Sequence, residues 1–504
     1  MQKLQRSTPW AEGLDPKTVL DLLHYYDQNQ TGVQSIMILR HGRVVAEAWW
    51  NPYRAEFPHM LFSMSKSFTS IAVGFAVQEG LLSIHDKLLD FFPDILPPDA
   101  GPCDYMKELT LRDMLRMATG HVTEPPVGVR GTNDGDWMFR FLSSYIEKKP
   151  GTHYLYNTAA TYMLSAVVQR VSGMKLVDYL KPRLFDPLGF GEYWWEQSPE
   201  GVSAGGTGFH LQTEDIAKFG LFLLNKGSYG GERLLDAKWI EQATAKQIDF
   251  TEHINIDSRQ GYGYQFWRCQ PEESYRAAGA FAQFCVVLPK QDMVVAVTSG
   301  AQDTQPVLTA LWDILLPGLR SEAENVEQNQ QTLEAFAAGL TVPTAVGEPD
   351  SPEASAYWKP VYELSENPLR IERVAFSRKD GENKMRLTIG GIESEVPLGY
   401  SRWVDSAPAC VPPVTSRDIV PVDCNLSACG AWTSPNTFRA VLCYNRTPFR
   451  DILDFHFDAY GFKLHHQRKT GFHLVDDFYF GRPVTDPLAV SGQSGASPKA
   501  EFRF

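Results

Sequence analysis

The stretch LFSMSKSFTS, at residues 61–70, places a serine hydroxyl three residues before a lysine amine. In a helix that begins here, the side chains of Ser63 and Lys66 share one face, with their Cβ atoms about 5–6 Å apart. The lysine can then take the serine proton, and the free N–H groups of the helix N-terminus favour an alkoxide and an oxyanion. A serine hydroxyl needs this help because it is a weak nucleophile at neutral pH. The pair predicts a nucleophilic serine; the alternative is an ordinary helix start with a solvated lysine.

The S-x-x-K pattern alone is a weak signal, because a chain of this composition contains about one match by chance. A second match joins Ser172 to Lys175. It contains Gly173, a residue that ends helices, so its two side chains would not be held on one helical face. Ser63 and Lys66 are therefore the candidate pair.

The elements around this pair show two periodicities. Apolar, β-branched runs at 35–50 and 284–300 are typical of β-hairpins. Between and after them the apolar spacing becomes helical. We expect helices at 63–79, 109–120, 158–173, 213–232 and 307–319. This order predicts an α+β domain over residues 1–320, in which helices flank an antiparallel sheet that contains both the first and the last strand.

The remainder of the chain differs in character. Residues 321–360 are polar and rich in Pro, Ser and Ala, which is typical of a linker. Short runs of alternating apolar and polar residues follow, and they predict an all-β domain, barrel or sandwich, over 361–490. Residues 491–504 are expected to be a flexible tail.

Composition excludes several functional classes. The 504 residues carry a net charge of −13, which argues against binding to nucleic acid or to an anionic membrane surface. No apolar stretch is long enough to span a bilayer, and the N-terminus lacks the apolar core of a signal peptide. The seven cysteines are scattered without a C-x-x-C motif, so we expect reduced thiols and a cytoplasmic protein. A local disulfide among the four cysteines between 410 and 443 is the alternative.

Three consecutive segments together resemble a known family. FSMSKSFTS, GLLSIHDKLLDFFPD and LTLRDMLRMATGH occur in the order found in the β-lactamase-related serine hydrolases. This superfamily includes class C β-lactamases, D-Ala-D-Ala carboxypeptidases, family VIII esterases and 6-aminohexanoate-dimer hydrolases. The resemblance extends over residues 15–318. It implies the fold of the β-lactamases and penicillin-binding proteins, and catalysis through an acyl-enzyme.

The second motif of that family is Y-x-N. Alignment on the following helix gives Tyr156 the tyrosine position, and Thr158 stands where the family usually has asparagine. A phenol beside Lys66 can have a lowered pKa and act as general base and acid. Tyr154 is the competing candidate, and for either tyrosine the alternative is a core aromatic residue.

The third motif of the family is K-T-G or H-x-G, and here the chain departs from it. Ala277, Ala278 and Gly279 occupy these positions, so the cation that meets the substrate carboxylate in the penicillin-recognising members is missing. Gly279 still allows close backbone approach, and the N–H groups of Ala280 and Ser63 can form an oxyanion hole. Arg276 is adjacent, but alternation along a strand directs it to the opposite face.

Other residues are weaker candidates. We expect His121, Trp137 and Gln283 to line the substrate cleft together with Thr158; a satisfied loop histidine and a core tryptophan are the alternatives. The pair His465-His466 does not predict a metal site, because adjacent residues on a strand face opposite ways and no acidic partner recurs at a metal-binding spacing. No cofactor is expected.

The sequence thus predicts a hydrolase for a small-molecule ester or amide, acting through Ser63. The alternatives are a β-lactamase or D-amino-acid peptidase, and a catalytically decayed penicillin-binding-like module. The C-terminal domain loosely resembles the barrel domains of some D-aminopeptidases and penicillin-binding relatives. Two roles are open for it: shaping the cleft, or self-association into a homo-oligomer.

Overall fold

The computed structural model describes residues 3–95, 102–127, 135–250, 255–320, 322–379, 381–406 and 425–484. The chain divides into two compact units, residues 1–340 and 341–504. Each unit is described by itself. The predicted tail at 491–504 lies outside the described residues, and so do Cys410 and Cys424; Cys103, Cys269, Cys285 and Cys429 are free thiols.

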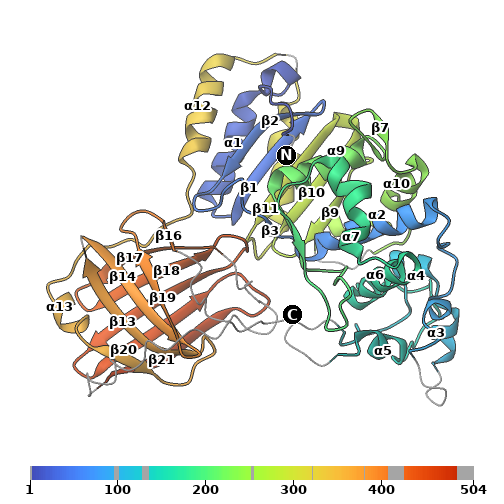
Figure 1. Cartoon of the computed structure of the whole chain (residues 1–504). Helices are drawn as coiled ribbons and strands as arrows, with labels where there is room; N and C mark the ends of the chain where they lie inside the picture. Colours follow the sequence, from blue (N-terminus) through green and yellow to red (C-terminus); the bar gives the residue numbers. More distant parts are fainter. Residues whose placement is uncertain are drawn as a thin grey trace. The chain divides into compact units, whose positions relative to one another are not determined.

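A six-stranded sheet forms the centre of unit 1 (Figure 1). Its order is β2-β1-β11-β10-β9-β8, and every neighbouring pair is antiparallel. Strand β1 pairs with β11 although about 250 residues separate them, with Met37 opposite Ala296. The expected α+β class and the shared sheet are therefore confirmed. The strands are β1 (Val33–Arg40), β2 (Arg43–Trp49), β8 (Trp267–Arg268), β9 (Tyr275–Gly279), β10 (Gln283–Leu288) and β11 (Met293–Ser299).

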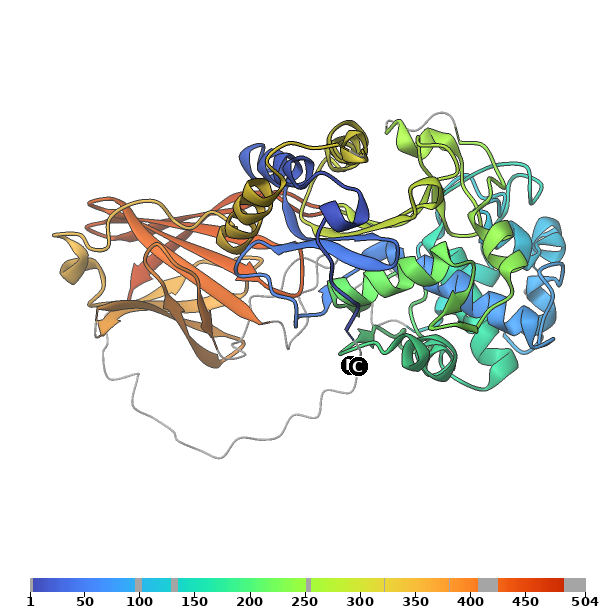
Figure 2. The ribbon, with the colours of Figure 1, turned by 90° about the horizontal axis from the view of Figure 1, so that it is seen from above.

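Helices cover both faces of this sheet, because the side chains of its central strands are apolar on both sides (Figure 2). Ile36 and Ile38 face a groove that α1 (Pro16–Gln28) and α12 (Val326–Gly339) border. Met37 and Leu39 belong to the main core, which includes residues of α9 (Thr213–Leu224).

A helical lobe completes unit 1. Its central helix is α2 (Ser65–Gln78), which is buried from Ser65 to Ala76 and packs against α6 (Thr158–Ser172). The predicted helix at 109–120 is shorter in the structure, because Met117 has a positive φ of 58° that ends it. The other helices are α3 (Asp104–Glu108), α4 (Leu111–Leu115), α5 (Trp137–Leu142), α7 (Leu176–Leu180), α8 (Asp186–Leu188), α10 (Ala237–Thr244) and α11 (Gln305–Ala310). Short strands complete the unit: β3 (His59–Met60), β4 (Trp194–Trp195), β5 (Phe209–Leu211), β6 (Ser228–Tyr229) and β7 (Glu232–Arg233).

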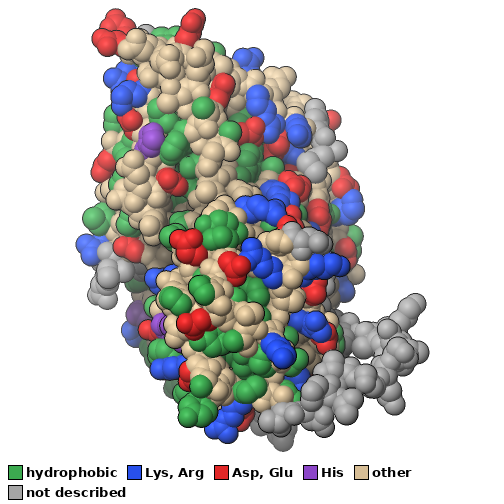
Figure 3. Space-filling model, turned by 90° about the vertical axis from the view of Figure 1, so that its left-hand side faces the viewer, with side chains coloured by type: hydrophobic (Ala, Val, Ile, Leu, Met, Phe, Trp, Pro, Cys, Tyr) green, Lys and Arg blue, Asp and Glu red, His purple; other side chains and the backbone are tan. Residues whose placement is uncertain are grey.

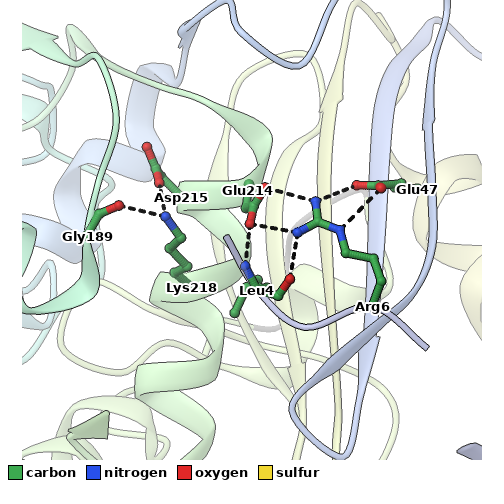
Figure 4. A network of polar contacts seen from close by, with 7 residues as sticks. All are labelled: Leu4, Arg6, Glu47, Gly189, Glu214, Asp215 and Lys218. Carbon is green, nitrogen blue, oxygen red and sulfur yellow. Dashed lines mark hydrogen bonds and ion pairs between the residues drawn. The ribbon is translucent and has the colours of Figure 1, made fainter. Parts of the chain in front are cut away.

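Polar contacts along α9 anchor two other segments of unit 1 (Figure 4). Arg6 forms ion pairs with Glu47 of β2 and Glu214 of α9, both at 2.9 Å, and this attaches the N-terminal segment. The next residue, Asp215, forms a fully buried pair at 2.9 Å with Lys218, which lies one turn further along the helix. The lysine also donates to the carbonyl of Gly189, so the pair positions the preceding loop as well.

The predicted linker at 321–360 differs from the structure. Helix α12 lies within it and packs on α1, where the rings of His24 and Phe336 are 4.0 Å apart. Leu333 and Ala337 line the same groove four residues apart, a spacing that places them on one helical face. The chain passes between the two units close to Thr341, since Leu340 accepts a hydrogen bond within unit 1 and Val342 accepts one within unit 2.

Unit 2 is a ten-stranded antiparallel sheet that nearly closes into a barrel, as the all-β prediction requires. Gly399, just after β15, forms a parallel bridge with Cys429 of β17, and this brings the two ends of the sheet together. Its order is β15-β14-β13-β12-β21-β20-β19-β18-β17-β16. The elements are α13 (Ala354–Tyr357), β12 (Val361–Leu364), β13 (Ile371–Lys379), β14 (Glu382–Ile389), β15 (Ile392–Leu398), β16 (Val404–Ser406), β17 (Leu426–Ser434), β18 (Thr437–Tyr444), β19 (Arg450–Asp458), β20 (Gly461–Arg468) and β21 (Val475–Pro483).

Two surface properties bear on the expected partners. Among the described residues, no helix is both long and apolar enough to cross a membrane. On the face seen in Figure 3, lysine and arginine side chains are interspersed with aspartate and glutamate.

Candidate active site

Ser63 lies in a tight turn between β3 and α2. The turn is a single 3-10 turn from Phe62 to Met64, and the α-helix begins at Ser65, two residues later than the sequence predicts. Ser65 fixes the turn, because its hydroxyl donates to the Phe62 carbonyl at 2.6 Å and accepts from the N–H of Phe209 at 3.1 Å. Phe62 has a positive φ of 49°, an uncommon conformation for a bulky residue. Ser63 is half-buried.

Lys66 contacts Ser63 from the first turn of α2. Its Nζ donates to Ser63 Oγ at 3.1 Å, to Thr158 Oγ1 at 3.3 Å and to the carbonyl of Gly206 at 2.7 Å. The residue is only 1% exposed, and burial lowers the pKa of Lys66 to about 7. A lysine with such a pKa is partly neutral near pH 7, so it can accept the serine proton. The sequence analysis missed the Gly206 carbonyl, which comes from a loop about 140 residues away.

Tyr156 is the tyrosine that the structure brings to Ser63. The Ser63 hydroxyl acts on the phenol and partly lowers the pKa of Tyr156, and Lys66 Nζ lies 4.8 Å from the centroid of the Tyr156 ring. Burial raises the pKa of Tyr156, and this corrects the expectation that the neighbouring lysine lowers it. The phenol therefore stays protonated at neutral pH. In this pair the lysine is the stronger candidate for the base.

Tyr154 lies elsewhere. It is 8% exposed, stacks on Phe250 with ring centroids 4.3 Å apart, and packs edge-on against Tyr262. Its hydroxyl is buried and has no hydrogen-bond partner among the described residues. The structure thus places Tyr154 in an aromatic cluster and not beside Ser63.

The end of strand β9 lies against the turn that carries Ser63. A Cβ atom on Gly279 would lie 2.0 Å from the carbonyl oxygen of Leu61, so only glycine allows this approach. The rings of Phe62 and Phe281 meet edge to face, 5.2 Å apart, and add an apolar contact between the two segments. No hydrogen bond joins the N–H of Ser63 or of Ala280 to another described backbone or side-chain group. Both donors are thus available to an oxyanion.

Gln283 has a different place from the one expected. It is fully buried, and its amide donates to the carbonyls of Ala280 and Ser299 and accepts from the Ser299 N–H. The side chain therefore braces the turn after β9. It acts on the site through the backbone of that turn instead of lining the cleft.

No cation occupies the position of the family's lysine. Ala277 is 0% exposed and belongs to the main core. Arg276 points the other way, as strand alternation predicts: its guanidinium donates to the Arg268 carbonyl and to Ser258 Oγ, and lies 5.7 Å from the ring of Trp267.

The structure also places His121 and Trp137 away from the role predicted for them. His121 is 2% exposed, its two ring nitrogens contact the hydroxyls of Thr119 and Ser144, and burial lowers the pKa of His121 to about 4. Trp137 packs edge-on against Tyr162 in the main core. The hydrogen bonds of His121 are those of a satisfied loop histidine, and the packing of Trp137 is that of a core residue.

Besides the Gly206 carbonyl, two other features of the site were not predicted from the sequence. Glu124, an exposed residue, accepts a hydrogen bond from the N–H of Thr158 at 2.5 Å. Its charge also acts on Lys66, whose pKa it raises. A pocket of about 390 Å³ lies beside Tyr156 and is lined by Tyr154, Leu155, Phe250 and Trp267 as well. Sequence spacing carries no signal for either feature, because both bring together segments far apart in the chain.

The sequence predicts no acidic partner for the pair His465-His466, and the structure of unit 2 shows that this prediction is wrong. Pairing of β19 with β20 brings Asp454, His456 and His465 together, with ligand atoms within 4.8 Å of one another. All three side chains already have partners: Arg439 pairs with Asp454, Thr437 with His456, and Asp476 with His465. These contacts explain the cluster without a metal ion.

Comparison with known proteins gives a consistent result. The sequence profile of the β-lactamase family matches residues 22–317. The 6-aminohexanoate-dimer hydrolase of Paenarthrobacter ureafaciens is 22% identical over 308 residues, which are 58% of this chain and 77% of that protein. The β-lactamase of Escherichia coli K12 is 20% identical over 283 residues, 52% of this chain and 71% of that protein. The crystal structure of a family VIII carboxylesterase aligns with a TM-score of 0.50 at 17% identity, over 63% of this chain and all of that one.

Proposed function

The chain belongs to the β-lactamase family of serine hydrolases, and on that premise we propose that it hydrolyses an ester or amide bond through an acyl-enzyme on Ser63. The observation that carries this proposal is the contact of Lys66 Nζ with Ser63 Oγ at 3.1 Å, made by a lysine whose pKa burial lowers to about 7. Such a lysine is an adequate base for a serine hydroxyl.

In the proposed reaction, Ser63 attacks the carbonyl carbon while its proton passes to Lys66. The N–H groups of Ser63 and Ala280 bind the oxyanion of the tetrahedral intermediate. Tyr156 donates a proton to the leaving group as the bond to carbon breaks, and it regains one from Lys66. In the second half, water gives a proton to the same pair and attacks the acyl carbon. The pair returns that proton to Ser63 Oγ as the bond from this oxygen to the acyl carbon breaks, which releases the acid and restores the serine.

The substrate class is the second part of the proposal. The missing cation at Ala277 disfavours substrates that must pair a carboxylate there, so a neutral ester or amide is favoured over a penicillin. The aromatic pocket beside Tyr156 offers an apolar surface for an acyl or leaving group. Relatives named as a family VIII carboxylesterase and as a 6-aminohexanoate-dimer hydrolase support this choice.

Covalent labelling tests the nucleophile. A fluorophosphonate probe should modify the wild-type protein at Ser63, and mass spectrometry of the peptides after proteolysis locates the adduct. Ser63→Ala should lose both the adduct and the hydrolysis of p-nitrophenyl butyrate. Ser172→Ala is the matched control, because it removes the serine of the other S-x-x-K match. An adduct on a different serine would contradict the assignment.

The same assay distinguishes the alternative of a decayed binding module. Such a module would bind or slowly acylate without turnover, so a single burst of p-nitrophenol with no steady-state phase supports it. The cytoplasmic location also stays a proposal, supported by the free thiols of Cys103, Cys269, Cys285 and Cys429. Self-association through unit 2 is a further proposal, and light scattering of the full chain measures it.

A further inference from the structure

The pocket beside Tyr156 has further walls that the mechanism above does not use. Its volume is about 390 Å³, and its lining consists of Tyr154, Leu155, Tyr156, Phe250 and Trp267. Four of these five side chains are aromatic, and none of the five is charged at neutral pH. An apolar cavity of about 150 Å³ is large enough to hold benzene. The pocket therefore has room for a system of one or two rings.

The rings of this pocket form two nearly parallel pairs. Tyr154 and Phe250 stack with centroids 4.3 Å apart and 28° between their planes. Tyr156 and Trp267 lie 20° from parallel, with centroids 5.9 Å apart. The side chains of Leu155, Tyr156, Phe250 and Trp267 are half-buried, so a ligand can cover their remaining surface. Flat walls favour a flat guest, because aromatic rings gain energy from offset and edge-on packing beyond the area that they bury.

A buried cation lies behind one of these walls. Arg276 is 3% exposed, and its guanidinium carbon lies 5.7 Å from the centroid of the Trp267 ring. Its hydrogen bonds to described residues go to a carbonyl, a thiol and a hydroxyl, and to no carboxylate. The charge reaches a second wall, since it partly offsets the burial that raises the pKa of Tyr154. A cation against the Trp267 ring disfavours a second cation there and favours a neutral, electron-rich ring.

Tyr156 determines which part of a substrate lies next to this pocket. In the proposed reaction its phenol protonates the leaving group, and the same side chain is a wall of the pocket. A leaving group within hydrogen-bond reach of this hydroxyl therefore has the other aromatic walls beside it.

We propose that the pocket binds an aromatic ring of the departing alcohol or amine, so that the preferred substrates are esters or amides with an aryl or arylalkyl leaving group. This proposal rests on the proposed hydrolysis at Ser63 and names the substrate class of that site. Phe250 and Trp267 are then specificity-determining residues. The alternatives are a pocket for the acyl group and a purely structural aromatic cluster.

Matched esters isolate the aromatic ring. Benzyl butyrate and cyclohexylmethyl butyrate have leaving groups of similar size and acidity, one with a flat ring and one with a saturated ring. Both give the same butyryl-enzyme, so a difference in kcat/KM arises before or during departure of the alcohol. The measured quantity is the aryl ratio, which is kcat/KM for the benzyl ester divided by that for the cyclohexylmethyl ester. Cyclohexyl is the more hydrophobic ring, so a merely apolar surface does not raise this ratio.

We expect an aryl ratio of about threefold or more in the wild type, which is the scale of an aromatic pair. Phe250→Leu and Trp267→Leu keep an apolar wall but remove a flat ring, so each should lower the ratio toward one. A general disturbance of the site affects both esters and cancels in the ratio. Phe480→Leu is the matched control, because Phe480 belongs to unit 2 and is 57% exposed. Its ratio should equal that of the wild type.

A second pair of esters tests which side of the substrate enters the pocket. Methyl 3-phenylpropanoate and methyl 3-cyclohexylpropanoate carry the ring on the acyl group, and their ratio should be near one and unchanged by Phe250→Leu. An aromatic preference confined to this pair overturns the proposal, and so does a wild-type aryl ratio near one or a ratio that neither variant lowers. Ester hydrolysis without an aryl preference removes only this inference. Hydrolysis of no ester, or hydrolysis that survives Ser63→Ala, removes the proposed function with it.

Discussion

At the scale of single residues, Lys66 is distinguished by its partners. All three acceptors of its hydrogen bonds are neutral, whereas the buried Lys218 pairs with the carboxylate of Asp215. A buried ammonium without a carboxylate in contact loses solvation that nothing restores, so its neutral form is favoured. This is why a lysine in this position can serve as a base.

The first prediction concerns pH. If neutral Lys66 is the base, kcat/KM for p-nitrophenyl butyrate should rise with pH, with a midpoint at about 7, and level off above it. Because the negative charge of Glu124 raises the pKa of Lys66, Glu124→Gln should move the midpoint to lower pH. A rate that is independent of pH between about 5 and 9 would exclude Lys66 as the titrating base.

The second prediction separates the two tyrosines. Tyr156→Phe removes the hydroxyl that interacts with Ser63, so turnover should fall by roughly 10²-fold or more, the scale of lost acid–base help. Tyr154→Phe removes a buried hydroxyl without a described partner and should change turnover much less. A larger loss at position 154 would move the catalytic tyrosine by two residues.

The third prediction concerns the missing cation. Ala277→Lys would restore the residue type of K-T-G, but the alanine side chain is fully buried in the core. We therefore expect the variant to lose about 1–3 kcal/mol of unfolding free energy from overpacking alone, without a gain in benzylpenicillin hydrolysis. Urea unfolding and a penicillin assay measure the two effects. Efficient penicillin turnover by the wild type would show that another group replaces the lysine.

At the scale of elements, the site depends on the contact between the end of β9 and the turn before α2. Gly279 allows it, the rings of Phe62 and Phe281 pack across it, and Gln283 braces the turn that follows. The proposed oxyanion donors come from these two segments, so their separation decides whether both N–H groups reach one oxygen atom.

The fourth prediction follows from that contact. The methyl group of Gly279→Ala would collide with the Leu61 carbonyl and push β9 away from Ser63. We expect kcat to fall by about 10²-fold, as for the loss of one oxyanion donor, while the secondary structure persists. Gly339→Ala is the control, because a Cβ atom there meets nothing within 4 Å. Full activity of Gly279→Ala would refute the close approach.

At the scale of the whole molecule, the two units have separate cores and almost no connecting segment. Residues 326–339 form a helix of unit 1, and residues from Val342 onward bond to unit 2. The polar composition of 321–360 therefore reflects the exposed face of α12 and a short surface segment.

The fifth prediction tests this arrangement. Endoproteinase Glu-C, under native conditions, should cleave residues 326–348 slowly, although Glu327, Glu334 and Glu348 are available to it. Leu333→Ala removes a buried anchor of α12, at a cost of about 2–3 kcal/mol, and should make cleavage at Glu334 faster. Early cleavage of the wild type at Glu334 would restore the interpretation of this stretch as a linker.

The sequence by itself determined the fold class and the candidate nucleophile. Both are local properties: apolar periodicity separates helix from strand, and a spacing of three residues places Ser63 and Lys66 within reach of each other. The hairpins at 35–50 and 284–300 and the all-β character after residue 361 were predicted for the same reason.

Only the tertiary structure decided which side chains meet Ser63 and in what protonation state. The choice of Tyr156 over Tyr154, the contact of Lys66 with Gly206, and the position of Glu124 join segments that are 30 to 140 residues apart. Burial, which no local pattern reports, lowers the pKa of Lys66 and raises that of Tyr156, and so favours the lysine over the tyrosine as the base. The polar stretch that resembles a linker likewise forms helix α12 because one of its faces packs on α1. The stability of a short helix comes mainly from the face that it buries.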